Sequence, residues 1–220
     1  MPGQRRSRPD PSTEAVGGIP SDTELNERLW TENMSRRLVI LPRLSLHIRG
    51  GTIDIRLGTK FVVGRRTRQT DLDPLEVDPA MARSLQERHE IGLSDSFVVH
   101  PSQLVLACTL EYISLPNDLA SSVIGRSTFG RAGLLSATAT HVHPGYKGCL
   151  TLELLNLGQV PIKLRPGMRI GQLVFYHQNP GSPMQACKYF LATGPEFPRM
   201  WDDDDAPLLK RLGNQAAQHC

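Results

Sequence analysis

The stretch from Gly125 to Tyr176 reads GRSTFGRAGLLSATATHVHPGYKGCLTLELLNLGQVPIKLRPGMRIGQLVFY and decides the fold of this chain. It contains three runs of β-type composition, at 148–156, 161–164 and 169–176. Between the last two, Arg165–Met168 has Pro and Gly where a type II turn requires them, and we interpret it as a structural turn. Short apolar runs separated by Gly and Pro turns are typical of an all-β domain.

Short β-type runs also fill much of the chain upstream of this stretch. They lie at 38–40, 44–48, 53–57, 60–63, 96–99, 103–106 and 110–114. The charged residues 65–90 form a long excursion, in which we expect a short helix at 81–87. Residues 118–124 are predicted to form one or two helical turns that lead into Gly125. Many short strands with little helix indicate a β-barrel or sandwich.

The two ends of the chain differ from this β-rich middle. Residues 1–20 are rich in Pro, Gly and Arg without periodicity, and we expect a disordered tail there. Residues 198–220 contain an acidic run and are expected to form a solvated tail, with a short helix at 206–212. The folded domain is therefore expected to span residues 21–197.

A short helix is predicted at the start of this domain. Ser21 can serve as its N-cap, and Glu24, three residues later, completes a capping box. Leu25 and Leu29 give the helix an apolar face, and we expect it to end near Asn33.

Composition argues against two classes of partner. The formal net charge is +3 with scattered basic residues, and aromatic residues make up only 5% of the chain, so we expect no nucleic-acid binding. No apolar run reaches the ~18 residues of a membrane span, so we expect no membrane association. The N-terminus lacks the apolar core of a signal peptide, which favours a cytoplasmic protein.

The cysteines and histidines do not form a recognisable metal motif. The four cysteines are Cys108, Cys149, Cys187 and Cys220, and no Cys-x-x-Cys pair exists. The signature of zinc-dependent deaminases is also absent, so we expect no zinc site. His141 and His143 lie on one side of an extended chain but lack a third ligand nearby in sequence, which favours solvent-facing or hydrogen-bonded histidines.

An anion-binding turn is predicted at Gly125–Arg131. Backbone N–H groups of a glycine-flanked turn can hold an anion, and Arg126 and Arg131 can add bidentate bonds to phosphate oxygens. Ser127 supplies a hydroxyl on the same turn. Spacing alone leaves an ordinary surface turn with solvated charges equally open.

Glu153 is the candidate general base. Alternation along 149–155 places it with Cys149 and Thr151 on one strand face, opposite three leucines. Loss of solvation would raise its pKa and suit it to proton transfer at neutral pH. A glutamate paired with Arg or Lys across the sheet is the alternative. Nearby, Gly145–Gly148 is predicted as a hairpin tip, whose Tyr146 could cover a base or cap the turn.

In this order, the motifs resemble the dCTP deaminase branch of the dUTPase-like superfamily. The resemblance spans roughly residues 21–195 and is most specific in Gly-Arg-Ser-x-x-x-Arg and the later Gly-Cys-x-x-x-Glu. It implies a distorted, jelly-roll-like β-barrel of the β-clip type with a short N-terminal helix. It also implies a homotrimer with active sites at subunit interfaces.

The resemblance further implies zinc-independent hydrolysis of dCTP to dUTP and ammonia, with Mg²⁺ accompanying the triphosphate. Glu153 matches the glutamate that activates water, and Ser127 and Arg131 match residues that help to hold the catalytic site. The remaining matches to substrate-binding positions are Arg126 and Thr128 at the triphosphate, Thr151 and Leu152 at the base, Ala139 at a close backbone approach, His143 near the sugar, and Lys188 in a C-terminal lid.

Two positions depart from the family pattern. His143 stands where the family has an Asp that contacts the sugar 3′-hydroxyl and, in dUTPases, activates the hydrolytic water, which argues against diphosphate release. Ala192 stands where a lid glutamine is usual. Two alternatives to dCTP deamination therefore stay open: action on another cytidine nucleotide, modified or ribo-, and nucleotide binding without catalysis in a regulatory role.

Overall fold

The computed structural model describes residues 17–137, 141–178 and 189–217. Ala139 and Lys188 lie outside the described residues. The elements in chain order are α1 (Asp22–Trp30), β1 (Val39–Leu41), β2 (Thr52–Gly64), α2 (Pro79–Leu85), β3 (Gln86–Glu90), β4 (Phe97–Val99), β5 (Leu104–Ser114), β6 (Leu119–Gly125), α3 (Ser127–Arg131), β7 (Leu134–Ala137), β8 (His141–Val142), β9 (Lys147–Asn156), β10 (Ile162–Leu164), β11 (Arg169–His177), the 3₁₀ turn η2 (Met200–Asp202) and α4 (Ala206–Ala217).

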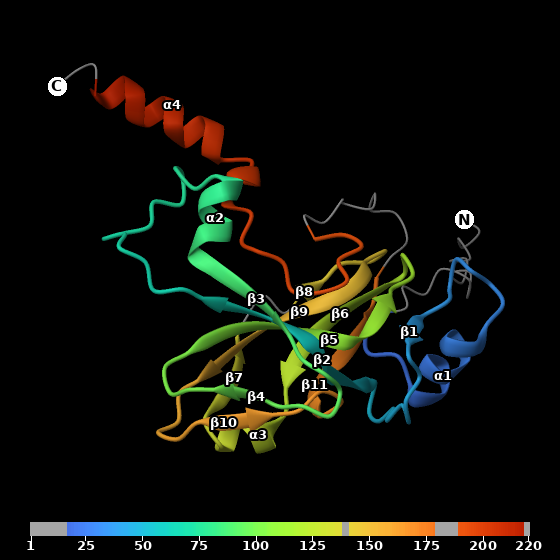
Figure 1. Cartoon of the computed structure of the whole chain (residues 1–220). Coiled ribbons are helices and arrows are strands. Elements are labelled where there is room, and N and C mark those ends of the chain that lie inside the picture. Colours follow the sequence, from blue (N-terminus) through green and yellow to red (C-terminus); the bar gives the residue numbers. More distant parts are fainter. Residues whose placement is uncertain (1–16, 138–140, 179–188, 218–220) are drawn as a thin grey trace, which may run out of the picture.

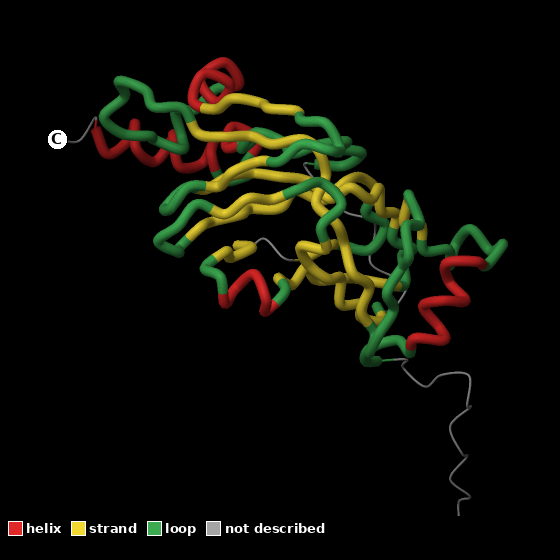
Figure 2. The backbone as a smooth tube through the Cα atoms, turned by 60° about the horizontal axis from the view of Figure 1, so that its bottom comes forward, coloured by secondary structure: helices red, strands yellow, loops and turns green. Residues whose placement is uncertain are grey.

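The strands build one curled antiparallel sheet. Its order is β7-β9-β5-β2-β11-β6-β8, with β1 added to β5 and β3 to β2, while β10 and β4 pair separately. Figure 2 shows the strands wrapping around a common interior rather than lying flat. The mainly β, distorted-barrel prediction with a short N-terminal helix is confirmed. The interior is filled by apolar side chains from the long strands, including Ile53, Ile55, Phe61, Ile113, Leu154, Leu173 and Phe175.

The two longest strands are continuous where the sequence predicts breaks. Runs 53–57 and 60–63 merge into β2, and runs 103–106 and 110–114 merge into β5. The β2–β5 register shifts between Leu57 and Phe61, so the predicted break is a bulge. Gly58 sits there because a Cβ atom would approach the Sγ atom of Cys108 to 2.9 Å. Such bulges bend long strands and help the sheet to curl.

The predicted helical turns at 118–124 are wrong. Residues 119–125 form the strand β6, which pairs with β11 along its whole length. The Ser121 hydroxyl donates to the carbonyl oxygen of Val174 at 2.9 Å, so its polar group is satisfied across the sheet. In this segment, helical structure begins only after Gly125, with the short helix α3. Sheet pairing has overridden the weak local preference.

The predicted hairpin at Gly145–Gly148 is also wrong. The preceding strand β8 pairs with β6, whereas β9 pairs with β5 and β7. The segment is therefore a crossing between two parts of the sheet. Its backbone does need glycine, since φ is +75° at Gly145 and +146° at Gly148. By contrast, the turn at Arg165–Met168 is confirmed, with φ of +83° at Gly167.

Helix α1 begins as predicted and ends earlier. The N–H of Glu24 donates to the Ser21 hydroxyl at 3.1 Å, but the Glu24 carboxylate accepts from Arg28 at 2.9 Å instead of closing the capping box. Arg28, 4% exposed, also makes two 2.9 Å bonds to the carboxylate of Asp118. This arginine ties α1 to the start of β6. The helix ends at Trp30 rather than near Asn33.

The C-terminal region is more structured than an acidic tail. Helix α4 runs to Ala217, beyond the predicted 206–212, and projects away from the sheet beside α2 (Figure 1). Lys210 on α4 pairs with Glu76 at 3.4 Å. The segment that leads to α4 crosses the sheet, where the carbonyl oxygen of Ala192 accepts from the N–H of Cys149 at 2.7 Å. Residues 189–200 therefore cover part of the sheet.

Candidate active site

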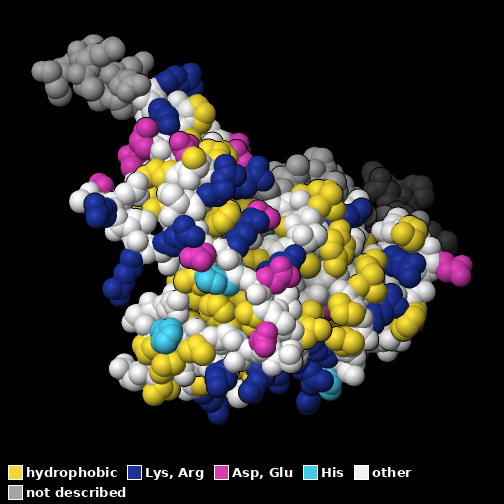
Figure 3. All heavy atoms as spheres, in the orientation of Figure 1, with side chains coloured by type: hydrophobic (Ala, Val, Ile, Leu, Met, Phe, Trp, Pro, Cys, Tyr) yellow, Lys and Arg dark blue, Asp and Glu magenta, His cyan; other side chains and the backbone are white. Residues whose placement is uncertain are grey.

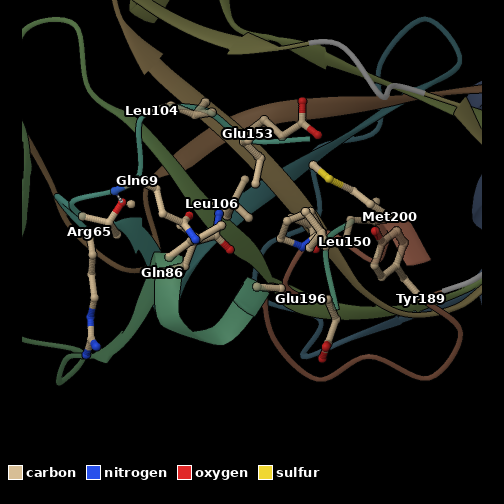
Figure 4. A pocket seen from close by; sticks show the side chains of 18 of the residues that line it. Arg65, Gln69, Gln86, Leu104, Leu106, Leu150, Glu153, Tyr189, Glu196 and Met200 are labelled. Atoms are coloured by element: carbon tan, nitrogen blue, oxygen red, sulfur yellow. Dashed lines mark hydrogen bonds between the residues drawn. The ribbon is translucent and has the colours of Figure 1, made fainter. Parts of the chain in front are cut away.

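A cavity of about 830 Å³ lies over one face of the curled sheet and contains Glu153. Figure 4 shows Glu153 between two groups of side chains: Leu104, Leu106, Gln69 and Gln86 on one side, Tyr189 and Met200 on the other. The first group comes from the sheet and the excursion after β2, and the second from the C-terminal segment. Segments far apart in sequence thus meet around one carboxylate.

The strand alternation predicted for β9 is confirmed. Leu150, Leu152 and Leu154 are buried in the core, while Thr151 and Glu153 are half-buried on the cavity side. Both Thr151 and Glu153 line the cavity, and Leu150 also borders it (Figure 4). The side chain of Leu152 is only 2% exposed and turned into the core, so this residue could meet a ligand only through its backbone.

Glu153 is not held in an ion pair. Its cross-strand neighbour on β5 is Leu106, and no Lys, Arg or His among the described residues forms a salt bridge with it. The alternative of a glutamate neutralised across the sheet is therefore not realised within the described part of the chain. A half-buried carboxylate with apolar neighbours on an open cavity can reach a bound water and exchange a proton with it.

A polar end of the cavity is formed by the chain before β9. His141, His143 and Tyr146 line it, and the two imidazole rings meet edge-to-face with centroids 4.6 Å apart. Burial, and secondarily the neighbouring His143, lower the pKa of His141. The Tyr146 hydroxyl donates to the carbonyl oxygen of Cys149 at 2.9 Å, so this side chain braces the loop as well as facing the cavity.

The predicted anion site lies elsewhere. Arg126 precedes α3, and Ser127, Thr128 and Arg131 are exposed on that helix. Figure 3 shows Lys and Arg side chains gathered along the lower edge of the molecule, where Figure 1 places α3 and β10. Arg126 donates to the carbonyl oxygen of Arg169 at 3.3 Å. None of these four residues lines the Glu153 cavity, so one chain does not bring the two predicted parts together.

Sequence reasoning missed a buried polar group beside Arg126. The Asp54 carboxylate is 6% exposed, accepts from Gln172 at 2.8 Å and lies 3.7 Å from the Arg169 guanidinium. The carbonyl oxygen of Arg169 also accepts from Arg126. The cluster of Asp54, Gln172 and Arg169 therefore helps to hold the strand end that leads into α3. The sequence signal for this buried group was a charged residue, Asp54, within the apolar run Ile53–Leu57.

A second buried carboxylate was also missed. Glu111 on β5 is 0% exposed and accepts from both the backbone N–H and the guanidinium of Arg56, at 2.9 and 3.1 Å. Burial raises the pKa of Glu111, while the bonds from Arg56 oppose that rise. This pair joins β2 to β5. It does not line the Glu153 cavity and has a structural role.

The remaining cavity walls were not predicted. The excursion contributes Leu72, Val77, Leu85 and Gln86, and the C-terminal segment contributes Tyr189, Glu196, Pro198 and Met200. Ala192, at the usual position of a lid glutamine, is 8% exposed and bonded to β9 through its backbone, so it does not enter the cavity. Apolar residues in a charged loop were the only sequence signal for this wall.

The described ranges contain neither a metal cluster nor a membrane-spanning helix. There, no three His, Cys, Asp or Glu side chains gather closely enough to hold a metal ion. No helix in the described part of the chain has the length and apolar character to span a bilayer.

Comparison with known proteins agrees with the fold and with the resemblance in sequence. A family model described as dCTP deaminase-like matches residues 21–178. A dCTP deaminase from Halorubrum lacusprofundi is 35% identical over 209 residues, which cover 91% of this chain and 98% of that protein. A dUMP-forming dCTP deaminase from Acidothermus cellulolyticus is 38% identical over 179 residues, covering 78% of this chain and 92% of the relative.

Structural similarity is consistent with these matches. The crystal structure of 2′-deoxycytidine 5′-triphosphate deaminase from Agrobacterium tumefaciens superposes with a TM-score of 0.53 at 24% identity. The match covers 74% of this chain and 48% of that one, so this chain spans about half the length of the solved protein and shares its fold. Since the family model covers most of the sequence, this chain belongs to the dCTP deaminase-like family.

Proposed function

We propose that this protein deaminates dCTP by hydrolysis. The observation that carries the proposal is Glu153: a half-buried carboxylate, free of ion pairs among the described residues, on a cavity large enough for a nucleoside. Family membership and relatives named dCTP deaminase support the choice of dCTP. The cytosine ring would lie against Thr151 and Glu153, with its C4 atom next to the carboxylate.

The proposed chemistry needs one group that both takes and gives a proton. Glu153 would remove a proton from a water whose oxygen adds to C4. It would then transfer that proton to the amino nitrogen, and the C4–N bond would break to release ammonia. Proton transfer of this kind contributes typically ~10²–10⁴-fold. The rest of the rate enhancement must come from positioning the water and the ring.

The triphosphate requires cations that the Glu153 cavity does not supply. Arg126 and Arg131, with the hydroxyls of Ser127 and Thr128, form the proposed phosphate site, and Mg²⁺ would arrive bound to the substrate. Since these residues do not line the cavity of their own chain, we propose that a second copy brings its α3 to the cavity. A homotrimer with shared sites accounts for this separation.

Two observations bear on the identity of the product and point in opposite directions. His143, which lines the cavity, offers no fixed negative charge to activate water at a phosphate, which supports dUTP as the product. The Acidothermus relative is named dUMP-forming, which favours a second hydrolysis. We propose dUTP as the main product and dUMP formation as the second candidate.

A nucleotide panel tests the proposal directly. Purified protein is incubated with Mg²⁺ and dCTP, CTP or dUTP, and ammonia, diphosphate and nucleotide products are quantified. We expect ammonia and dUTP from dCTP, with little diphosphate. Tight dCTP binding without any product would mean that the protein is a regulatory nucleotide-binding protein rather than an enzyme. Faster turnover of CTP than of dCTP would mean that the substrate is the ribonucleotide.

A further inference from the structure

The cavity continues well beyond Glu153, across the sheet to Gln86. On the same sheet face, Glu153 pairs with Leu106, and Leu106 pairs with Val62 on β2. Gln86 on β3 pairs with Gly64, two residues further along β2. Three strand spacings and a two-residue offset place the Cα atoms of Glu153 and Gln86 on the order of 15 Å apart. We call the region beyond Glu153 the far lobe; it is lined by Leu72, Val77, Leu85, Gln86, Leu104 and Leu106.

The far lobe is unsuited to phosphate. Its walls are mostly apolar, the polar residues Gln69 and Gln86 are neutral, and the carboxylates of Asp71 and Glu196, like that of Glu153, would repel an anion. Arg65 also borders the cavity, but its guanidinium pairs with Glu87 at 3.1 Å and points away from the other labelled side chains in Figure 4. Burying a triphosphate here without paired cations would be strongly unfavourable.

The contrast between the far lobe and the polar end of the cavity sets the direction in which a cytidine nucleotide binds. The sugar and triphosphate must point away from the far lobe, toward the polar end with His141 and His143. In cytosine, the sugar-bearing N1 and the amino-bearing C4 lie opposite each other across the ring. The amino group therefore faces both Glu153 and the entrance to the far lobe.

We propose that the far lobe accepts a substituent on this amino group, so that the site also hydrolyses N4-alkyl derivatives of dCTP. The inference rests on the proposed deamination at Glu153. Water oxygen adds to C4, Glu153 carries the proton from that water to N4, and the C4–N4 bond breaks. The products are dUTP and a primary amine in place of ammonia. No oxidant or reductant is required.

A substrate series tests the inference. The protein is given dCTP, N4-methyl-dCTP and N4-butyl-dCTP, and dUTP and the released ammonia or amine are quantified. We expect kcat/KM for the butyl derivative within about tenfold of that for dCTP. Turnover of dCTP without turnover of the butyl derivative overturns the inference alone. Absence of turnover for every substrate overturns the proposed function as well.

Two variants locate the substituent. Leu85→Trp narrows the lobe from α2, so kcat/KM for the butyl derivative should fall at least about tenfold while that for dCTP stays within about twofold. Leu93→Trp, at an exposed position outside the cavity, is the matched control. An equal effect of Leu85→Trp on both substrates would show that the chain lies elsewhere.

Discussion

Two glutamates on adjoining strands illustrate how local environment divides roles between identical side chains. Glu111 on β5 is fully buried and bound by Arg56. Glu153 on β9 is half-buried, has an apolar cross-strand neighbour and opens onto the cavity. A general base must reach water and change its protonation state, which a carboxylate locked to a buried guanidinium cannot do readily. We therefore propose Glu153, rather than Glu111, as the general base.

Replacing Glu153 by Gln keeps the size of the side chain and removes its basicity. We expect kcat for dCTP deamination to fall by about 10²–10⁴-fold, measured as dUTP formed per unit time. Glu196→Gln is the matched control, since this carboxylate also borders the cavity but pairs with Arg88 at 3.5 Å; its kcat should change only a few-fold. Equal activities of Glu153→Gln and the unmodified protein would remove Glu153 from the mechanism.

His143 provides the residue-scale test of product identity. His143→Asp places a carboxylate on the polar wall of the cavity, where it could activate water toward the phosphates. We expect the ratio of dUMP to dUTP, measured by chromatography of the products from dCTP, to rise in this variant. His141→Asp is the neighbouring control and should raise the ratio less. If the unmodified protein already releases diphosphate as fast as ammonia, His143 does not limit the second hydrolysis.

At the scale of elements, the β2–β5 pair depends on the buried Arg56–Glu111 interaction. Arg56→Met leaves the Glu111 carboxylate buried without its cation, and we expect the free energy of unfolding to fall by about 3–5 kcal/mol. The double variant Arg56→Met, Glu111→Leu removes both charges and should recover most of that loss. Urea unfolding followed by circular dichroism measures both changes. A double variant as unstable as Arg56→Met would show that shape, rather than charge, holds the two strands.

At the scale of the whole molecule, α3 and the Glu153 cavity lie apart within one chain, which predicts a shared active site. Glu153→Gln and Arg131→Ala should each be inactive alone. When the two variants are dissociated and reassembled together, about a quarter of the sites should combine an intact Glu153 with an intact Arg131 from another copy. Sedimentation analysis establishes the oligomer, and dCTP turnover measures the recovery.

The matched control for this mixing experiment carries both changes in one chain. Glu153→Gln mixed with the double variant Glu153→Gln, Arg131→Ala cannot rebuild an intact site in any arrangement. Recovery in the first mixture and none in the second would establish sharing between copies. Mixed oligomers that stay inactive in both cases would mean that Arg131 does not complete the cavity of a neighbouring copy.

The sequence by itself determined what depends on local pattern. Alternation along β9 placed Glu153 opposite three buried leucines, Ser21 capped α1, and the Pro-Gly turn fell at Arg165–Met168. These features follow from the two-residue period of a strand and from the backbone limits of Pro and Gly. The short β-type runs also gave the correct fold class.

Tertiary structure alone decided what depends on strand pairing. It made residues 119–125 a strand where helical turns were predicted, because β11 offered a full set of hydrogen-bond partners, and it sent β8 to β6 rather than into a hairpin. It buried Glu111 against Arg56, brought the excursion and the C-terminal segment over Glu153, and kept α3 out of that cavity. Contacts between residues distant in sequence leave no periodic trace, since each side chain meets its neighbours only after the sheet has curled.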